Sequence, residues 1–262
     1  MKGKLIVLTG IDGSGKTVQT NLLCARLKRE GVSVETIDFP QYGKTLFAEL
    51  VARYLRGEFG SLENVSPYLA ATLFAGDRFE SKGMLEGWLA EGKVVIANRY
   101  VCDNIAHQGV RISGSGVCAE MSQFVDWVAR LEHDIYKLPK SDLNILLSIP
   151  PSVAFKFVSA KAERAYLEGL KKDIHEENIY YLTNVSKAFH VLATTQPGWR
   201  VVGCADENGV PWNETVVSEK VWACVGEWLK TGHTIAKPMP NYKPGTMAAL
   251  HVVDNWDVQG KA

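Results

Sequence analysis

The feature that most constrains this chain is a glycine-rich turn directly after its first apolar run. Residues 5–9 read LIVLT and residues 10–17 read GIDGSGKT, which fits the pattern GxxxxGK[ST]. Glycines let a backbone close around an anion, and the N-terminus of a following helix points its N–H groups at that anion. Apolar residues recur at helical spacing over residues 16–29. The sequence therefore predicts a strand, a phosphate-binding loop and a helix.

This loop predicts a site for a nucleoside triphosphate and its metal ion. The Lys16 ammonium can reach the β- and γ-phosphates, and the Thr17 hydroxyl can bind Mg²⁺. A carboxylate beside a triphosphate is unfavourable, so we expect Asp12 to face elsewhere, such as a sugar hydroxyl, or to be a solvated loop residue. A chance match of the pattern arises in about one chain in a hundred of this length. The predicted ATP-binding set is Gly10, Asp12, Gly13, Ser14, Gly15, Lys16 and Thr17.

Apolar runs alternate with helix-like segments over residues 1–230. Short runs rich in Ile, Leu and Val suit strands that are buried on both faces of a parallel sheet. The predicted strands are residues 5–9, 32–38, 94–97, 143–149 and 199–203, and the predicted helices are residues 16–29, 44–56, 66 to about 90, 117–135, 173–195 and 214–230. The alternation predicts a three-layer α/β domain, in which a five-stranded parallel sheet with right-handed crossovers is flanked by helices.

Composition excludes several classes of protein. Lys plus Arg and Asp plus Glu both total 29, so no overall field attracts nucleic acid or a membrane. No apolar run approaches the roughly 20 residues of a membrane span. The five cysteines are odd in number and form no CxxC pair, which is typical of free thiols in a reducing cytoplasm. We expect a cytoplasmic protein without a nucleic-acid or membrane partner.

Residues 231–262 differ in character from the rest of the chain. They carry prolines at positions 238, 240 and 244 and have little periodicity. We expect a C-terminal extension that is wrapped on the surface or partly mobile, and its role is unknown.

Three further stretches carry candidate substrate-binding residues. In residues 38–45, DFPQYGKT, the pair Phe39 and Pro40 ends a strand, and Tyr42 stands where the next helix opens. In residues 73–78, LFAGDR, Phe74 and Arg78 are four apart and share a helical face. That face could stack and hydrogen-bond a base. Alternatively, Phe74 lies in the core and Arg78 pairs with a neighbouring acid at the surface. Taken alone, this stretch slightly favours that second interpretation.

The third stretch is residues 97–109, ANRYVCDNIAHQG, which follows a predicted strand. Ligands in open α/β sheets bind beyond the carboxyl ends of the strands, which is where Arg99 stands. A guanidinium group suits bidentate recognition of a phosphate. The alternative is a structural salt bridge.

Together these motifs resemble the thymidylate kinase family of the P-loop nucleoside monophosphate kinases. IDGSGKT, DFPQYGKT, LFAGDR, NRYVCDNIAHQG and LNILLSIPPSVA occur in the order and at the spacing of that family, over about residues 4–230. The resemblance implies a P-loop NTPase fold with a helical lid at about residues 156–173. It further implies transfer of a phosphoryl group from ATP to dTMP with Mg²⁺, and a homodimer packed through its long helices.

The resemblance also implies residue roles. Phe74 would stack the thymine ring and Arg78 would bond its O4 edge, while Arg99 would hold the acceptor monophosphate. Asp12 would contact the deoxyribose 3′-hydroxyl. The implied dTMP-binding set is Asp12, Phe39, Pro40, Tyr42, Phe74, Arg78, Arg99, His107 and Gln108.

The chain departs from the family pattern at several of these positions. Asn98 stands where an aspartate that helps to place Mg²⁺ is usual, and Asp103, in place of a serine, could restore that charge. His107 replaces a usual tyrosine. Tyr42 replaces an arginine that holds the monophosphate in many relatives, and Lys44 could substitute for it.

The lid carries the remaining catalytic candidate. Phosphoryl transfer needs cationic charge over the moving phosphate. Family members without an arginine in the phosphate loop use a lid arginine, and this loop has Ser14 there. Arg164 is the only arginine in residues 156–178, so it joins Lys16 and Arg99 as a predicted catalytic residue. The alternative is a solvated helical face.

Three rival functions remain open at this point. One is a kinase for another nucleoside monophosphate or for a deoxynucleoside. A second is a nucleotide-binding regulator that has lost catalysis, for which Asn98 is the main argument and against which Lys16, Thr17 and Arg99 stand. A third is a nucleic-acid-stimulated ATPase, although the zero net charge gives no sign of a basic surface.

Overall fold

The computed structural model describes residues 3–113, 119–159 and 179–231 of the chain. Its strands form one five-stranded sheet in the order β2-β3-β1-β4-β5, and every neighbouring pair is parallel. The strands are β1 (Lys4–Thr9), β2 (Val34–Asp38), β3 (Val94–Asn98), β4 (Leu143–Ser148) and β5 (Trp199–Gly203). The predicted parallel sheet is therefore confirmed. Each strand begins and ends within two residues of its predicted limits.

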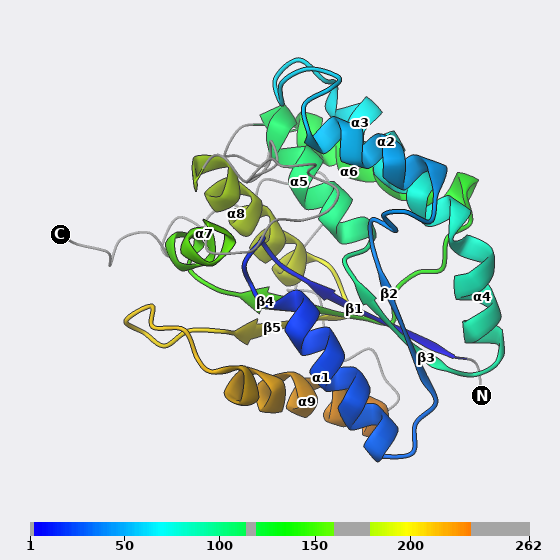
Figure 1. The fold of residues 1–262 in the computed structure, drawn as a ribbon, viewed down its shortest axis with the longest axis vertical. Coiled ribbons are helices and arrows are strands. Elements are labelled where there is room, and N and C mark those ends of the chain that lie inside the picture. Colours follow the sequence, from blue (N-terminus) through cyan, green and yellow to red (C-terminus); the bar gives the residue numbers. More distant parts are fainter. Residues whose placement is uncertain (1–2, 114–118, 160–178, 232–262) are drawn as a thin grey trace.

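Helices cover both faces of this sheet, as the predicted three layers require (Figure 1). In the view of Figure 1, α1 and α9 lie side by side on one face, and α5 and α8 lie together on the other. The helices are α1 (Lys16–Arg29), α2 (Leu46–Leu55), α3 (Pro67–Glu80), α4 (Lys82–Ala90), α5 (Val101–Ser113), α6 (Ala119–Ala129), α7 (Pro151–Ser159), α8 (Ile179–Thr195) and α9 (Glu214–Thr231). A π-helical turn, η1 (Arg130–Ile135), follows α6.

The core explains why the central strands read as unbroken apolar runs. Leu5, Ile6, Val7 and Leu8 of β1 have no exposed surface, and all five residues of β3 are buried. Both strands have neighbours on each side and helices on each face, so no side chain points to water. The edge strands β2 and β5 instead mix buried and exposed positions.

The helix predicted from residue 66 to about residue 90 is wrong as a single element. The chain ends α3 at Glu80 and begins α4 after Ser81, which caps the first helix through its backbone N–H. The break lets the two segments pack on different partners, because α3 lies against α2 and α5, whereas α4 lies against β3. Tertiary packing therefore overrides a continuous local pattern.

Two further findings concern membrane spans and the cysteines. Among the residues described, no helix is long and apolar enough to cross a membrane. Within the same ranges Cys24, Cys102, Cys204 and Cys224 are free thiols.

Candidate active site

The glycine-rich turn forms a tight loop between β1 and α1. Gly10, Gly13 and Gly15 all adopt positive φ values, of 141°, 86° and 88°. A Cβ atom on Gly13 would lie 2.3 Å from the carbonyl oxygen of Ala154 in α7, so this position admits no side chain. Gly15 caps α1 without any side-chain hydrogen bond. The first N–H groups of α1 therefore receive no side-chain cap, which is the arrangement that suits a phosphate.

Lys16 lies across this loop. Its ammonium group donates to the carbonyl oxygens of Gly10 and Ile11 at 2.8 and 2.9 Å, and it lies 3.8 Å from the Asp12 carboxylate. The side chain is almost wholly buried, so its charge is stabilised by these oxygens rather than by water. Thr17 follows at the first turn of α1 and is exposed. The loop thus fits the triphosphate and metal that the motif predicts.

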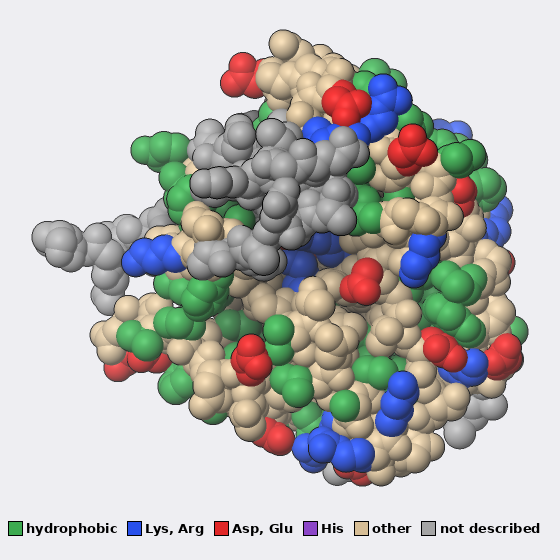
Figure 2. Space-filling view, in the orientation of Figure 1, with side chains coloured by type: hydrophobic (Ala, Val, Ile, Leu, Met, Phe, Trp, Pro, Cys, Tyr) green, Lys and Arg blue, Asp and Glu red, His purple; other side chains and the backbone are tan. Residues whose placement is uncertain are grey.

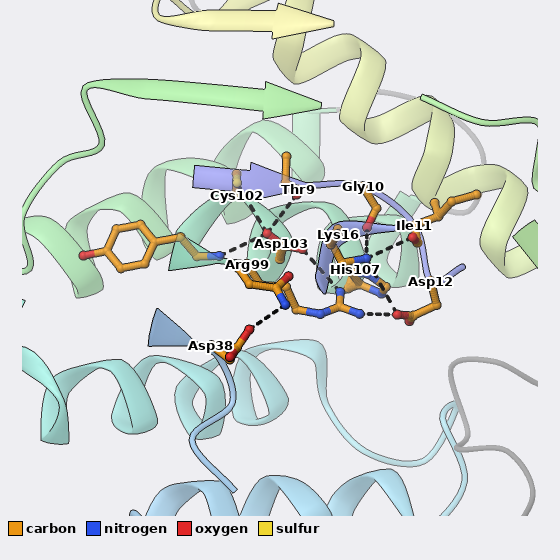
Figure 3. A network of polar contacts seen from close by, with 12 residues as sticks. Thr9, Gly10, Ile11, Asp12, Lys16, Asp38, Arg99, Cys102, Asp103 and His107 are labelled. Carbon is orange, nitrogen blue, oxygen red and sulfur yellow. Dashed lines mark hydrogen bonds and ion pairs between the residues drawn. The ribbon is translucent and has the colours of Figure 1, made fainter. Parts of the chain in front are cut away.

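Arg99 faces Lys16 from the end of β3 (Figure 3). Its guanidinium donates through Nη2 to Asp12 and through Nη1 to Asp103, the latter at 3.3 Å. Its backbone has a φ of 69°, in the left-handed region that non-glycine residues rarely adopt. Strain of this kind is concentrated at functional sites, because only the surrounding structure holds it in place.

Asp12 and Asp103 are the acidic partners of Lys16 and Arg99. Asp12 bonds Arg99 and lies 3.8 Å from Lys16, so its negative charge is balanced by these two cations. Asp103 also accepts from the Thr9 hydroxyl at 2.8 Å and from the backbone N–H of Tyr100 at 3.1 Å. The site therefore holds Arg99 between two fixed carboxylates before any substrate enters (Figure 3).

Arg78 is buried in a pair that the sequence did not predict. Its guanidinium donates to Glu132 through Nε at 2.5 Å and through Nη2 at 2.7 Å, and only 3% of the residue is exposed. Glu132 comes from the π-helical turn η1. The alternative that Arg78 pairs with a neighbouring acid at the surface is therefore wrong. Nη1 makes no hydrogen bond with the described residues and remains available as a donor.

Asn104 is a site residue that the sequence reasoning missed. Its Nδ2 donates to the Ala71 carbonyl and to Glu132 Oε1, both at 3.0 Å. Because both partners are acceptors, the orientation of the amide is fixed. Its Oδ1 is buried and has no partner among the described residues. Asn104 thus presents an acceptor beside Arg78, since both side chains bond Glu132. The signal was its position one turn after Arg99, in a helix that the sequence analysis did not assign.

Phe74 and Tyr42, of the segment at residues 38–45, pack against the same small hydrophobic cluster. Phe74 is half-buried and packs edge-on against Tyr54, with 6.2 Å between ring centroids. Phe39 is buried beside Tyr100 and donates its backbone N–H to the Asn98 carbonyl at 3.0 Å. Asp77 of α3 accepts from the Gln41 N–H and from the Thr45 hydroxyl. It therefore fixes the segment that carries Pro40 and Tyr42 onto α3.

Comparison with known proteins identifies the family. A family model described as thymidylate kinase matches residues 8–208. The thymidylate kinase of Mycobacterium tuberculosis is 32% identical over 207 residues, which cover 78% of this chain and 94% of that one. That of Thermomicrobium roseum is 30% identical over 229 residues, which cover 87% and 96% of the two chains. The chain belongs to the thymidylate kinase family.

A solved structure supports the fold of this thymidylate kinase family member. The thymidylate kinase of Candida albicans superposes with a TM-score of 0.65 at 21% sequence identity, covering 90% of this chain and 96% of that one. The P-loop NTPase fold is therefore shown, together with membership in the nucleoside monophosphate kinases.

The departures from the family pattern can now be placed in the structure. Asn98 donates through Nδ2 to Asp38 Oδ1 at 2.6 Å and to the Thr17 hydroxyl at 3.3 Å. Asp103 bonds Arg99 and Thr9 instead, so the carboxylate in contact with Asn98 is Asp38. Lys44 bonds the Gln41 side chain at 3.3 Å, within the segment that carries Tyr42.

His107 and Gln108 are both buried in α5. Burial, with the nearby Arg99 charge, lowers the pKa of His107 to about 4, so the imidazole is neutral near pH 7. Its Nδ1 lies 3.2 Å from the Tyr181 hydroxyl, which donates to the His107 carbonyl at 2.9 Å. Gln108 accepts from Arg111 at 2.5 Å. Arg164, most of the predicted lid and residues 232–262 lie outside the described residues.

Proposed function

We propose that the chain transfers the γ-phosphoryl group of ATP to dTMP and so produces ADP and dTDP. The observation that carries this proposal is the convergence of Lys16 and Arg99 on Asp12, between the ends of β1 and β3. One cation comes from the phosphate loop and the other from the opposing strand. A pair placed in this way can hold two anionic substrates with their phosphates facing each other. Figure 2 shows Lys and Arg side chains recessed near the centre of the face that it draws.

The chemistry requires positioning and charge rather than a dedicated base. The N-terminus of α1 and Lys16 hold the donor phosphates, while Arg99 holds the acceptor phosphate in a bidentate manner. Thr17 would bind Mg²⁺, which supplies charge neutralisation on the phosphates when bound. Asp12 contacts both cations, and we expect it to orient a sugar hydroxyl of the acceptor. Arg164 would add charge over the moving phosphate when the lid closes.

Base selection follows from the side chains around Glu132. Arg78 offers a donor through Nη1, and Asn104 offers an acceptor through Oδ1. Thymine and uracil present an acceptor at O4 and a donor at N3, so both bonds can form. Cytosine presents a donor at N4 and an acceptor at N3, so both contacts would be mismatched and the buried groups would stay unsatisfied. Phe74 would stack the ring. This arrangement supports dTMP over cytidine nucleotides.

The wider context of the reaction is part of the same proposal. Residues 1–230 act as one catalytic domain with its lid, and residues 231–262 are an extension of unknown role. We expect a homodimer, because α2 and α3 expose several apolar side chains, among them Leu46 and Leu69. The free thiols are consistent with a reducing cytoplasm.

One assay tests the proposed reaction against its rivals. Purified protein is incubated with ATP, Mg²⁺ and each nucleoside monophosphate or deoxynucleoside in turn, and ADP formation is measured. We expect the highest kcat/KM with dTMP, a lower value with dUMP and the lowest with dCMP. Turnover with another acceptor alone would refute the specificity. ATP binding without any turnover would favour the regulator, and turnover that requires nucleic acid would favour the ATPase.

A further inference from the structure

Three carboxylates stand at the carboxyl ends of β1, β2 and β3, around the phosphate loop. Asp12 and Asp103 are bonded to Arg99, and Asp12 also lies near Lys16. Asp38, the last residue of β2, forms no ion pair with any described residue. Asp38 is an exposed residue, and the hydrogen bond that its carboxylate accepts comes from the neutral amide of Asn98. Asp38 is therefore the one carboxylate of these three whose charge no described cation balances.

Asn98 connects Asp38 to the predicted metal ligand of the loop. Its Nδ2 lies 2.6 Å from Asp38 Oδ1 and 3.3 Å from Thr17 Oγ1. The carboxylate accepts only, so it fixes which end of the amide points toward it. Asn98 is 8% exposed, and its Oδ1 is buried without a partner among the described residues. A buried amide oxygen of this kind needs a donor, which a metal-bound water would supply.

The chemistry of these groups fits a hydrated magnesium ion. Mg²⁺ prefers oxygen ligands, keeps several of its waters, and is usually held through one or two carboxylates together with substrate phosphates. Those waters donate hydrogen bonds and therefore need acceptors around the ion. Two such acceptors lie next to Thr17, namely the Asp38 carboxylate and the side-chain oxygen Oδ1 of Asn98. No described cation pairs with either of them.

We propose that Asp38 supplies the carboxylate of the magnesium-nucleotide site, acting on waters of the ion, and that Asn98 is the positioning residue that ties this carboxylate to Thr17. The inference rests on the proposed function only in requiring that a magnesium nucleotide binds the phosphate loop. The carboxylate that the family usually has at position 98 of β3 is thus supplied in this chain by Asp38 of β2.

The same geometry explains why residue 98 is an asparagine. A carboxylate at position 98 would face Asp38 across a contact of the same length as the present 2.6 Å hydrogen bond. Two carboxylates at such a separation repel each other strongly. One acid and one amide avoid this repulsion while keeping a single negative charge beside the metal. The two positions are therefore coupled, and exchanging their residues should preserve the pair.

The test measures how much Mg²⁺ strengthens binding of ADP, by calorimetry with and without chelator, together with Mn²⁺ binding by electron paramagnetic resonance. We expect Asp38→Asn to reduce the Mg²⁺-dependent gain in ADP affinity by about tenfold, as loss of an outer-sphere partner typically does. ADP binding in chelator should stay unchanged or improve slightly, because a negative charge near the phosphates is removed. This metal-free affinity also reports whether the variant is folded.

Two further variants make the test specific. Asn98→Asp should lower the ADP affinity in chelator, because it adds a second carboxylate near the phosphates. The double exchange Asp38→Asn with Asn98→Asp should recover most of the Mg²⁺-dependent gain that Asp38→Asn loses. Glu63→Gln removes an exposed carboxylate that lies outside the site and should leave the gain unchanged.

The outcomes separate this inference from the proposed function. An undiminished gain in Asp38→Asn, beside a clear gain in the wild-type protein, overturns the inference and leaves the kinase proposal standing. If the Mg²⁺-dependent gain in ADP affinity is no larger in the double exchange than in Asp38→Asn alone, the coupling of the two positions is also overturned. If the wild-type protein gains no affinity from Mg²⁺, the metal part of the proposed function fails and this inference falls with it.

Discussion

At the scale of single residues, the site is built from charges that hold one another in place. Arg99 could be predicted from sequence, because it directly follows a buried strand in a parallel sheet. Its partner Asp12 could not, since it lies 87 positions away in the chain, whereas its other partner, Asp103, is only four positions away. For the same reason the sequence offers only neighbouring acids as ion-pair partners for Arg78, although its partner Glu132 is 54 positions away. Local patterns identify a charged group but not the distant residue that pairs with it.

Replacement of Arg99 tests the acceptor phosphate site. We expect Arg99→Ala to lower kcat/KM for dTMP by about ten- to a hundredfold, the loss that follows when hydrogen bonds to a charged group are removed. ATP affinity should change little, because the loop and Lys16 remain. Steady-state kinetics with each substrate varied in turn makes the distinction. An equal loss in ATP affinity would contradict the assignment of Arg99 to the acceptor phosphate site.

His107 makes stability depend on pH in a defined window. Burial lowers the pKa of its imidazole to about 4 in the folded protein, whereas an unfolded chain titrates near 6.5. Between these values the unfolded state binds more protons, so stability falls as the pH falls. The contribution amounts to about 3 kcal/mol between pH 7 and pH 4.

Urea unfolding across this range tests that contribution. Wild-type protein should lose stability more steeply between pH 6.5 and pH 4 than His107→Gln does. The difference between the two proteins isolates His107 from Asp77, whose pKa is raised by burial and which acts in the opposite direction. Parallel curves for the two proteins would contradict a neutral buried imidazole.

At the scale of elements, periodicity predicted the central strands well and the junctions between elements poorly. Strands β1 and β3 are buried on both faces, so their sequences are apolar throughout and easily recognised. The break at Ser81 and the π-helical turn that brings Glu132 inward arise from packing against other elements. No local signal marks either of them. The predicted lid lies mostly outside the described residues and stays a prediction.

The junction between the phosphate loop and α7 offers a test at this scale. Gly13 has a φ of 86°, and an added Cβ would meet Ala154 of α7. Gly31 has a φ of 76° with open space around it, so it provides a matched control. We expect Gly31→Ala to cost about 1 kcal/mol from backbone strain. Gly13→Ala should cost about 1–3 kcal/mol more from overpacking, and it should weaken ATP binding.

Denaturant unfolding and nucleotide titration of both variants measure these effects. Only Gly13→Ala should lose nucleotide affinity, because Gly31 lies beyond the far end of α1. Equal destabilisation of the two variants would contradict the close approach of α7 to the loop.

At the scale of the whole molecule, fold class and family could be predicted from the ordered motifs, whereas assembly could not. The proposed homodimer rests on α2 and α3, which expose Leu46 and Leu69 by 74% and 65%. Burial of such side chains in an interface would remove an unfavourable contact with water. The sequence shows which side chains are apolar but not which of them the fold leaves exposed.

Light scattering after size exclusion tests the proposed assembly. We expect a dimer for the wild-type protein and a shift toward monomer for Leu69→Glu, which would place a charge in the interface. Val210→Glu changes a side chain that is 59% exposed near β5, and it should remain dimeric. A monomeric wild-type protein at micromolar concentration, or an undisturbed dimer in Leu69→Glu, would contradict this assignment.

The most direct test of the central claim follows the transferred phosphoryl group itself. ATP labelled at its γ-phosphate is incubated with the protein, Mg²⁺ and dTMP, and the products are separated by chromatography. The arrangement of Lys16 and Arg99 predicts that the label appears in the β-phosphate of dTDP, with little inorganic phosphate. Label that is released as inorganic phosphate, or that remains on ATP in the presence of dTMP, would contradict the claim.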